Sequence, residues 1–250
     1  MEKIIVANWK MNPVTFKEAK KLFEDTKKAL DKVKQVSVVV APPVVFLREL
    51  RLAYKGKRIL FALQNAHFEP KGSHTGETSL AQGVDAGIAY VIVGHAERRA
   101  DGETDEAVNK KIIAALGLKL LPILCIGERD RDASGTYYDF IKEQLQSALR
   151  DVPVNKLSKI TIAYEPVWAI GGTVAMNPRD MHEMAIFIRK TIVDLYGSSG
   201  MSIKILYGGS VDETNAPDML HDGDVDGLLV GRVSTNAQQF TALITSVEKA

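Results

Sequence analysis

Residues 160–164 read Ile-Thr-Ile-Ala-Tyr, a run that is β-branched or apolar at successive positions rather than at alternate ones. Continuous apolarity over so short a run is typical of a strand buried on both faces, as in a parallel sheet that helices cover. Glu165 and Pro166 follow directly, so a carboxylate stands where the run ends. The stretch therefore predicts a central parallel strand with a charged group at its carboxyl end.

Similar runs recur along the chain, and each is followed by a longer amphipathic stretch. The complete set of runs is Ile4–Ala7, Val36–Ala41, Ile59–Leu63, Tyr90–Val93, Leu120–Ile126, Ile160–Tyr164, Ile203–Tyr207 and Leu228–Val230. Helix signals lie between them: Thr15–Glu18 and Ser79–Gln82 are capping boxes, and Asn177 places a good cap before Pro178. Eight strand–helix pairs in 250 residues predict an α/β fold, the closed (β/α)8 or TIM barrel of eight parallel strands surrounded by helices.

An open doubly wound sheet is the alternative architecture for this alternation. Such a sheet usually carries a glycine-rich dinucleotide turn after an early strand, whereas here the first run leads into Asn8-Trp9-Lys10. The polar loop Asp130–Gly135 is too short to be a linker between domains. We therefore expect residues 1–250 to form one catalytic barrel domain.

Composition narrows the class of protein further. The chain has 32 Lys and Arg against 31 Asp and Glu, so no basic excess indicates nucleic-acid binding. Its one cysteine, Cys125, cannot form an intramolecular disulfide, which fits a reducing compartment. Neither a secretory signal nor an apolar stretch long enough to cross a membrane is evident. We expect a cytoplasmic protein that binds neither nucleic acid nor membranes.

Polar residues at the carboxyl ends of the strands are candidate site residues, because active sites of such barrels lie at that face. They are Asn8, Lys10, His95, Glu165, Gly208-Gly209-Ser210 and Gly231. A carboxylate, an imidazole, an ammonium and two glycine-rich turns that can bind an anion suffice for proton abstraction next to the carbonyl of a phosphate ester. Each residue alone also fits a surface charge, a core histidine or an ordinary turn, so the interpretation depends on their joint placement.

Two other motifs resemble metal sites but lack essential ligands. Asp222–Gly227 opens like a calcium-binding EF-hand loop, but its twelfth position is Val233, where a bidentate glutamate is needed. His67 and His74 have no cysteine or carboxylate cluster at metal spacing. We therefore expect no metal site, and we expect Cys125 simply to pack in the core.

Five motifs, in order along the whole chain, resemble those of the triosephosphate isomerase family. They are Asn8–Asn12, Gly94–Arg99, Cys125–Glu128, Ala163–Gly171 and Tyr207–Val211. The resemblance implies an intramolecular aldose–ketose isomerase of glycolysis and gluconeogenesis, which interconverts glyceraldehyde 3-phosphate and dihydroxyacetone phosphate through an enediolate.

The resemblance also implies catalytic roles. Glu165 would move the proton between adjacent carbons and His95 would polarise the carbonyl, a pairing of base and neutral histidine for which this family is the well-known example. Lys10 would stabilise the enediolate and, with Asn8, hold the substrate.

The same resemblance implies phosphate and partner contacts. Gly171, Ser210 and Gly231 would offer backbone N–H groups to the phosphate, and no metal or organic cofactor is implied. The family is usually homodimeric, so the loop Asn65–Ser79, with Thr75 near its tip, would reach into a second subunit.

Three features depart from the family pattern. Ala96 replaces a serine, which removes a hydroxyl close to the base. The lid around 169–175 is one residue shorter and lacks a lysine. Arg232 replaces a second glycine, and because a guanidinium can bind a phosphate, we count Arg232 among the candidate substrate-binding residues.

Two alternative functions share these features. Another barrel isomerase or lyase, acting on a larger sugar phosphate or an indole precursor, would have the same fold and phosphate turns but no reason to combine Lys10, His95 and Glu165. An inactive phosphate-binding barrel would fit the departures but not the intact catalytic trio. Isomerase activity on glyceraldehyde 3-phosphate distinguishes the three functions.

Overall fold

Eight strands close into a barrel in the computed structural model, which describes residues 3–170 and 175–250. The strands are β1 Lys3–Asn8, β2 Val36–Ala41, β3 Ile59–Leu63, β4 Tyr90–Val93, β5 Leu121–Ile126, β6 Thr161–Tyr164, β7 Lys204–Tyr207 and β8 Gly227–Val230. Each pairs in parallel with the next along the chain, and β8 pairs with β1 from Ile4↔Gly227 to Ala7↔Val230. This closure confirms the TIM barrel and excludes the open sheet, and every predicted run matches its strand to within one residue at each end.

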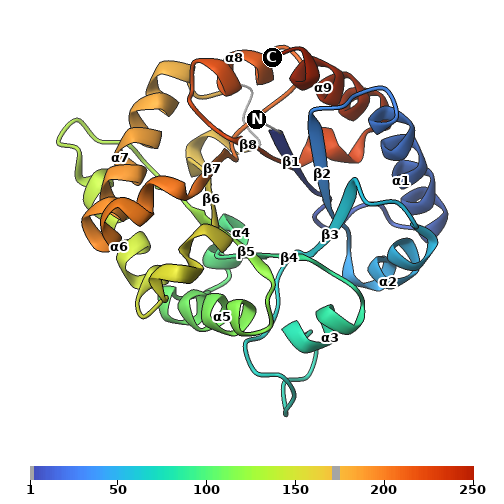
Figure 1. Cartoon of the computed structure of the whole chain (residues 1–250), viewed down its shortest axis with the longest axis horizontal. Coiled ribbons are helices and arrows are strands. Elements are labelled where there is room, and N and C mark those ends of the chain that lie inside the picture. Colours follow the sequence, from blue (N-terminus) through green and yellow to red (C-terminus); the bar gives the residue numbers. More distant parts are fainter. Residues whose placement is uncertain (1–2, 171–174) are drawn as a thin grey trace.

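Helices surround the barrel on all sides (Figure 1). In the described part of the chain they are α1 Phe16–Leu30, α2 Val44–Ala53, α3 Leu80–Asp85, α4 Ala96–Ala100, α5 Asp105–Gly117, α6 Thr136–Leu149, α7 Pro178–Tyr196, α8 Ala216–His221 and α9 Ala237–Lys249. Short 3-10 helices occupy Val154–Lys159 (η1), Val167–Ala169 (η2), Gly197–Ser202 (η3) and Arg232–Thr235 (η4). Among these described helices, none has the length and apolarity needed to span a bilayer.

The predicted helix starts are confirmed. Thr15 and Glu18 form the capping box of α1, Ser79 and Gln82 that of α3, and Asn177 caps α7 with Pro178 as its first residue. The sequence pattern did not predict α4, a five-residue helix inserted between β4 and α5.

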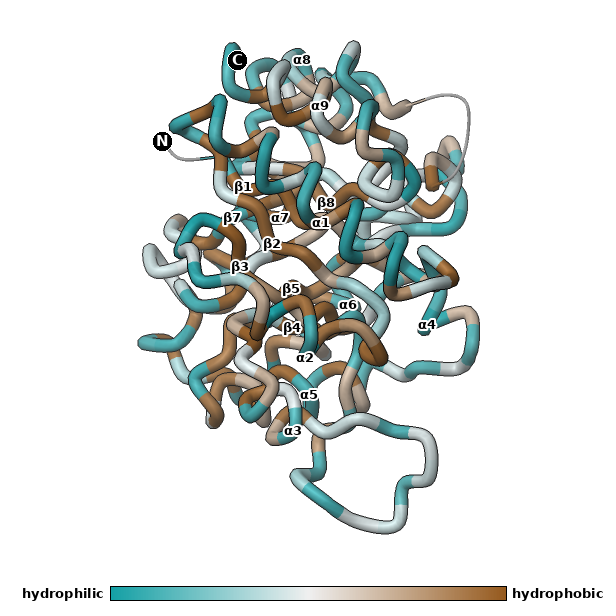
Figure 2. The backbone as a smooth tube through the Cα atoms, turned by 90° about the vertical axis from the view of Figure 1, so that its right-hand side faces the viewer, coloured by the Kyte–Doolittle hydropathy of each residue, from teal (hydrophilic) through white to brown (hydrophobic). Residues whose placement is uncertain are grey.

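Strand side chains alternate between two apolar cores. Ile4 and Val6 belong to a cluster built from all eight strands, which fills the inside of the barrel. Ile5 and Ala7 belong to a second cluster that strands and helices share. Figure 2 shows the apolar strands at the centre of the molecule, with hydrophilic segments concentrated towards the outside. Burial on both faces is the reason that the strand sequences are continuously apolar.

Gly227 allows the barrel to close, because a Cβ at this position would lie 2.0 Å from the carbonyl oxygen of Ile4. We expect Gly227→Ala to lower the free energy of unfolding by about 3 kcal/mol or more, since the backbones of β1 and β8 must separate to admit the methyl group. Chemical denaturation measures this change. Gly117→Ala, at the end of α5 with no atom within 4 Å of the new Cβ, is the control and should change stability by less than about 1 kcal/mol. Equal stabilities of the two variants would contradict this account of closure.

Candidate active site

A pocket of about 330 Å³ lies at the carboxyl ends of the strands. The candidate residues that line it are Asn8, Lys10, His95, Glu165, Ser210, Gly231 and Arg232. They come from the ends of five different strands, so closure of the barrel brings them together as expected. The remaining candidate, Gly171, lies outside the described residues.

Glu165 directly follows β6 and is 2 % exposed. Its backbone N–H donates to the Ile126 carbonyl at 2.7 Å, which continues the pairing of β6 with β5 by one residue. Its carboxylate oxygens have separate partners: Oε1 lies 3.3 Å from His95 Nε2, and Oε2 accepts a hydrogen bond from the Ala96 N–H at 3.3 Å. A buried carboxylate needs such donors, and here both of them come from the start of α4.

His95 is the N-cap of α4, and its Nδ1 accepts a hydrogen bond from the Glu97 N–H at 3.2 Å. A ring nitrogen that accepts is unprotonated, so the neutral ring carries its proton on Nε2. Nε2 is the nitrogen beside Glu165. The short helix α4 therefore fixes a tautomer that can donate a hydrogen bond to a carbonyl oxygen in the pocket.

Lys10 has a φ of 53°, the left-handed conformation that is uncommon for residues other than glycine. Asn8 accepts a hydrogen bond from the Lys10 N–H at 3.1 Å, and Gln64 Nε2 donates to the carbonyl oxygens of Lys10 and Ala41, each at 2.8 Å. Gln64 was not among the sequence candidates. It directly follows the run Ile59–Leu63, so the rule that selected Asn8 would also have found it.

The Lys10 ammonium lies 2.5 Å from Glu97 Oε1. Partial burial acts to raise the pKa of Glu97, but the hydrogen bond and charge of Lys10 outweigh this and hold it below its ordinary value. The Glu97 carboxyl group is therefore ionised at neutral pH. Lys10 lines the pocket while part of its charge is compensated by a residue of α4.

Glycines on two sides of Glu165 leave space for it. A Cβ at Gly208 would lie 2.7 Å from Glu165 Cγ, and a Cβ at Gly127 would lie 1.8 Å from the Glu165 carbonyl oxygen. A Cβ at Gly231 would lie 3.2 Å from Lys10 Cε. The sequence pattern at Gly208 indicates either an ordinary turn or an anion-binding turn, and no local pattern predicts its contact with Glu165.

Ser210 also lines the pocket, and its backbone N–H donates to the Ala169 carbonyl at 3.1 Å. Binding of a phosphate by this N–H requires it to exchange that partner. Arg232 is the first residue of η4, and its exposed side chain lies at the pocket wall.

The rejected metal motifs have structural roles. Asp226 Oδ2 accepts a hydrogen bond from the Ile205 N–H at 2.8 Å, and the rings of His67 and His74 stack with their centroids 3.9 Å apart. Among residues 3–170 and 175–250, no group of three or more His, Cys, Asp or Glu could hold a metal ion.

Cys125 is fully buried inside the barrel, which confirms its predicted packing role. Burial, and then the nearby charge of Glu165, raise the pKa of the Cys125 thiol well above its ordinary value. The group therefore stays a neutral thiol beside the carboxylate.

The family profile described as triosephosphate isomerase matches residues 3–247. The chain belongs to the triosephosphate isomerase family. Relatives named triosephosphate isomerase from Endomicrobium trichonymphae and Caldanaerobacter subterraneus subsp. tengcongensis are each 42% identical over 244 residues, which cover 96% of this chain and 97% and 98% of theirs. The relative of that name from Aquifex aeolicus is 38% identical over 248 residues, covering 98% of this chain and 100% of its own.

Membership of the triosephosphate isomerase family confirms the resemblance of the five motifs. One departure from the family pattern, the alanine at position 96 in place of a serine, lies next to Glu165 in the structure. The backbone N–H of Ala96 donates to Glu165 Oε2, so Glu165 has a hydrogen-bond donor at this position although the serine hydroxyl is absent.

Proposed function

We propose that this chain is a triosephosphate isomerase, which interconverts glyceraldehyde 3-phosphate and dihydroxyacetone phosphate by proton transfer through an enediolate. The observation that carries the proposal is the buried Glu165 carboxylate, which lies 3.3 Å from His95 Nε2. The hydrogen bond that Nδ1 accepts from the Glu97 N–H leaves the proton of the neutral ring on Nε2. A base and a neutral donor in one pocket meet the requirements of proton transfer next to a carbonyl.

Each side chain has a separate role in this reaction. Glu165 removes the proton from the carbon next to the carbonyl, and the electron pair of the C–H bond forms the carbon–carbon double bond of the enediolate. His95 donates through Nε2 to the oxygen on which negative charge develops. The Lys10 ammonium, placed by Asn8 and Gln64, stabilises the same charge. The proton then returns from Glu165 to the adjacent carbon, while the hydroxyl proton of the enediolate moves from one oxygen to the other by way of His95 Nε2, so that the new carbonyl forms. Because side chains supply base, donor and cation, the reaction needs no metal or organic cofactor.

We assign the phosphate to the other end of the pocket, with Gly171, Ser210 and Gly231 as backbone donors. Arg232 adds a cation where its guanidinium can form a charge-assisted hydrogen bond to a phosphate oxygen. The exposure of Arg232 at the pocket wall supports this assignment.

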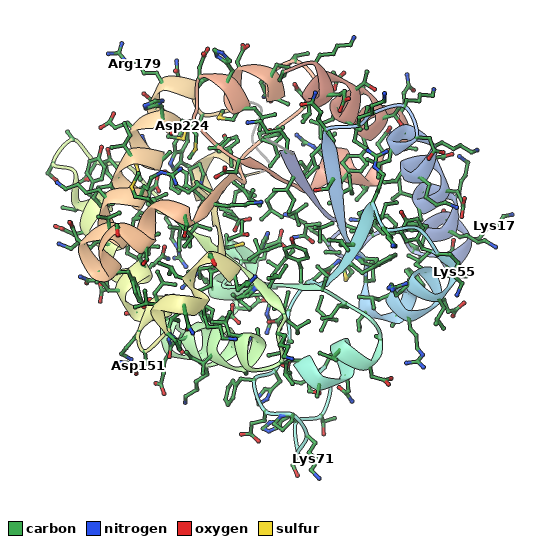
Figure 3. The ribbon with its side chains drawn as sticks, viewed as in Figure 1. Lys17, Lys55, Lys71, Asp151, Arg179 and Asp224 are labelled. Atoms are coloured by element: carbon green, nitrogen blue, oxygen red, sulfur yellow. The ribbon has the colours of Figure 1, made fainter. Side chains whose placement is uncertain are left out.

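We further propose a homodimer built through the loop between β3 and α3. This loop projects from the barrel at the bottom of Figure 1, and Figure 3 labels Lys71 at its end. The His67 N–H donates to the Thr78 carbonyl at 2.8 Å, which ties the base of the loop together around Thr75. Met11, 91 % exposed, is an apolar side chain that a second subunit could cover. We place this enzyme in the cytoplasm as one catalytic domain, residues 1–250, which agrees with its single buried thiol.

Glu165→Asp retracts the carboxylate by one methylene group. We expect turnover to fall at least about a hundredfold with a smaller change in KM, since proton abstraction depends on close placement of the base. A coupled assay on glyceraldehyde 3-phosphate measures both constants. Glu143→Asp, on the exposed side of α6, is the control and should leave them unchanged. Near-normal turnover of Glu165→Asp would show that another residue is the base.

The same assay on the unmodified chain separates the alternative functions. An inactive chain that folds and binds a phosphate ester would be a phosphate-binding barrel. Activity confined to a larger sugar phosphate would indicate a different barrel isomerase.

Arg232→Gly tests whether the guanidinium binds the phosphate. We expect KM to rise about tenfold, equal to about 1.4 kcal/mol of lost binding, and we expect more methylglyoxal by-product because a loosely held enediolate phosphate expels phosphate. Steady-state kinetics and product analysis measure both effects. Unchanged or improved values would mean that Arg232 points away from the substrate.

The proposed dimer predicts a particle of about twice the 27.4 kDa chain mass in sedimentation equilibrium. Thr75→Arg should shift the equilibrium towards monomer, because a charge at the loop tip would have to be buried in the partner. A monomeric unmodified chain would contradict the proposal.

A further inference from the structure

Glu128 is a second buried carboxylate near the base, and it is 1 % exposed. Its oxygens accept hydrogen bonds from the Tyr164 hydroxyl, 2.8 Å from each, and from Trp168 Nε1 at 2.9 Å. Burial, and then the charge of Glu128, raise the pKa of Tyr164, so its hydroxyl remains a donor. A carboxylate buried in this way also needs a compensating cation.

Arg131 supplies that cation and has aromatic contacts as well. Its Nε donates to Glu128 Oε1 and its terminal nitrogen donates to the Tyr164 hydroxyl oxygen, both at 2.9 Å. Its guanidinium carbon lies 4.8 Å from the ring centroid of Tyr137 and 5.5 Å from that of Trp168. A planar guanidinium can donate along its edges while its faces contact aromatic rings, which an ammonium group cannot do.

These contacts connect Arg131 to the active site from outside the pocket. Tyr164 is the last residue of β6 and directly precedes Glu165. Trp168 lies in η2, which leads to Ile170 at the pocket wall. The adjacent Ala169 carbonyl accepts the hydrogen bond from the Ser210 N–H. The loop that carries Arg131, between β5 and α6, thus contacts the chain on both sides of the base.

We propose that Arg131 is a positioning residue, which fixes Trp168 and Tyr164 relative to each other and so fixes the chain on both sides of Glu165. Its ion pair with Glu128 neutralises the buried charge. Its contact with the indole ring holds η2 in place over the end of β6. The effect on turnover rests on the proposed isomerase activity, whereas the anchoring of Trp168 does not.

Arg131→Lys separates positioning from charge neutralisation, because lysine keeps the positive charge but loses the planar contact with Trp168. We expect kcat to fall about tenfold with KM changed less than about twofold, since the base is displaced while the phosphate contacts remain. We also expect the tryptophan emission to shift to the red as the indole ring loses its cover. Arg131→Met, which removes the charge as well, should have the larger effect on stability.

Two further variants are controls. Arg129→Met changes an exposed arginine of the same loop, for which the described residues include no ion-pair partner, and it should leave kcat and emission unchanged. In a Trp168→Phe background, Arg131→Lys should cost less than about twofold in kcat, because coupled residues are not additive. The emission shift should also disappear, which assigns it to Trp168 rather than Trp9.

The outcomes separate this proposal from the proposed function. A normal kcat and an unchanged emission in Arg131→Lys would overturn the positioning role, even if the variant unfolded more easily. A loss of kcat that is the same in the Trp168→Phe background would overturn it too, because the effect would not pass through the indole ring. An inactive unmodified chain whose Trp168 emission still depends on Arg131 would remove the isomerase assignment and leave the anchoring intact.

Discussion

Burial of both faces of every strand is the constraint on which this site depends. Side chains such as Val6 enter the inner core and neighbours such as Ile5 enter the outer one, so a charge in the middle of a strand would be buried without partners. Polar side chains are therefore placed where strands end. Because the sheet closes on itself, the carboxyl ends of its strands surround one pocket. Asn8 and Gly231, more than 200 positions apart in the sequence, both line it.

Glu165 is the clearest consequence of this arrangement, because three strands contribute to its environment. The end of β4 supplies its hydrogen-bond donors through His95 and Ala96. The ends of β5 and β7 supply glycines, Gly127 and Gly208, without which its backbone or side chain would clash. A barrel with correct strands but one altered turn would therefore not hold the Glu165 carboxylate in this position. The precision of the site therefore comes from the turns, while its location comes from the closed sheet.

This division explains what the sequence could predict. Strand positions and helix caps depend on local pattern, so the run Ile160–Tyr164 predicts β6 to within one residue, and the Thr15 capping box is predicted as it is observed. The polar residues at strand ends that the structure describes, such as Asn8, His95 and Glu165, also line the pocket. The support for Lys10 could not be predicted, since its bond to Gln64 joins residues 54 positions apart and no local pattern records it. The contact of Gly208 with Glu165 could not be predicted either, because it too joins residues that are distant in the sequence.

The two buried carboxylates, Glu128 and Glu165, differ in the cations that contact them. An adjacent cation favours the ionised form of a carboxylate and so weakens its tendency to take a proton. Arg131 pairs directly with Glu128. Lys10 pairs instead with Glu97. Among the ion pairs of the described residues, Glu165 meets neither lysine nor arginine, only the imidazole of His95. Its hydrogen-bond donors are the imidazole of His95 and the Ala96 N–H, so the carboxylate is held in place with no direct lysine or arginine partner among the described residues.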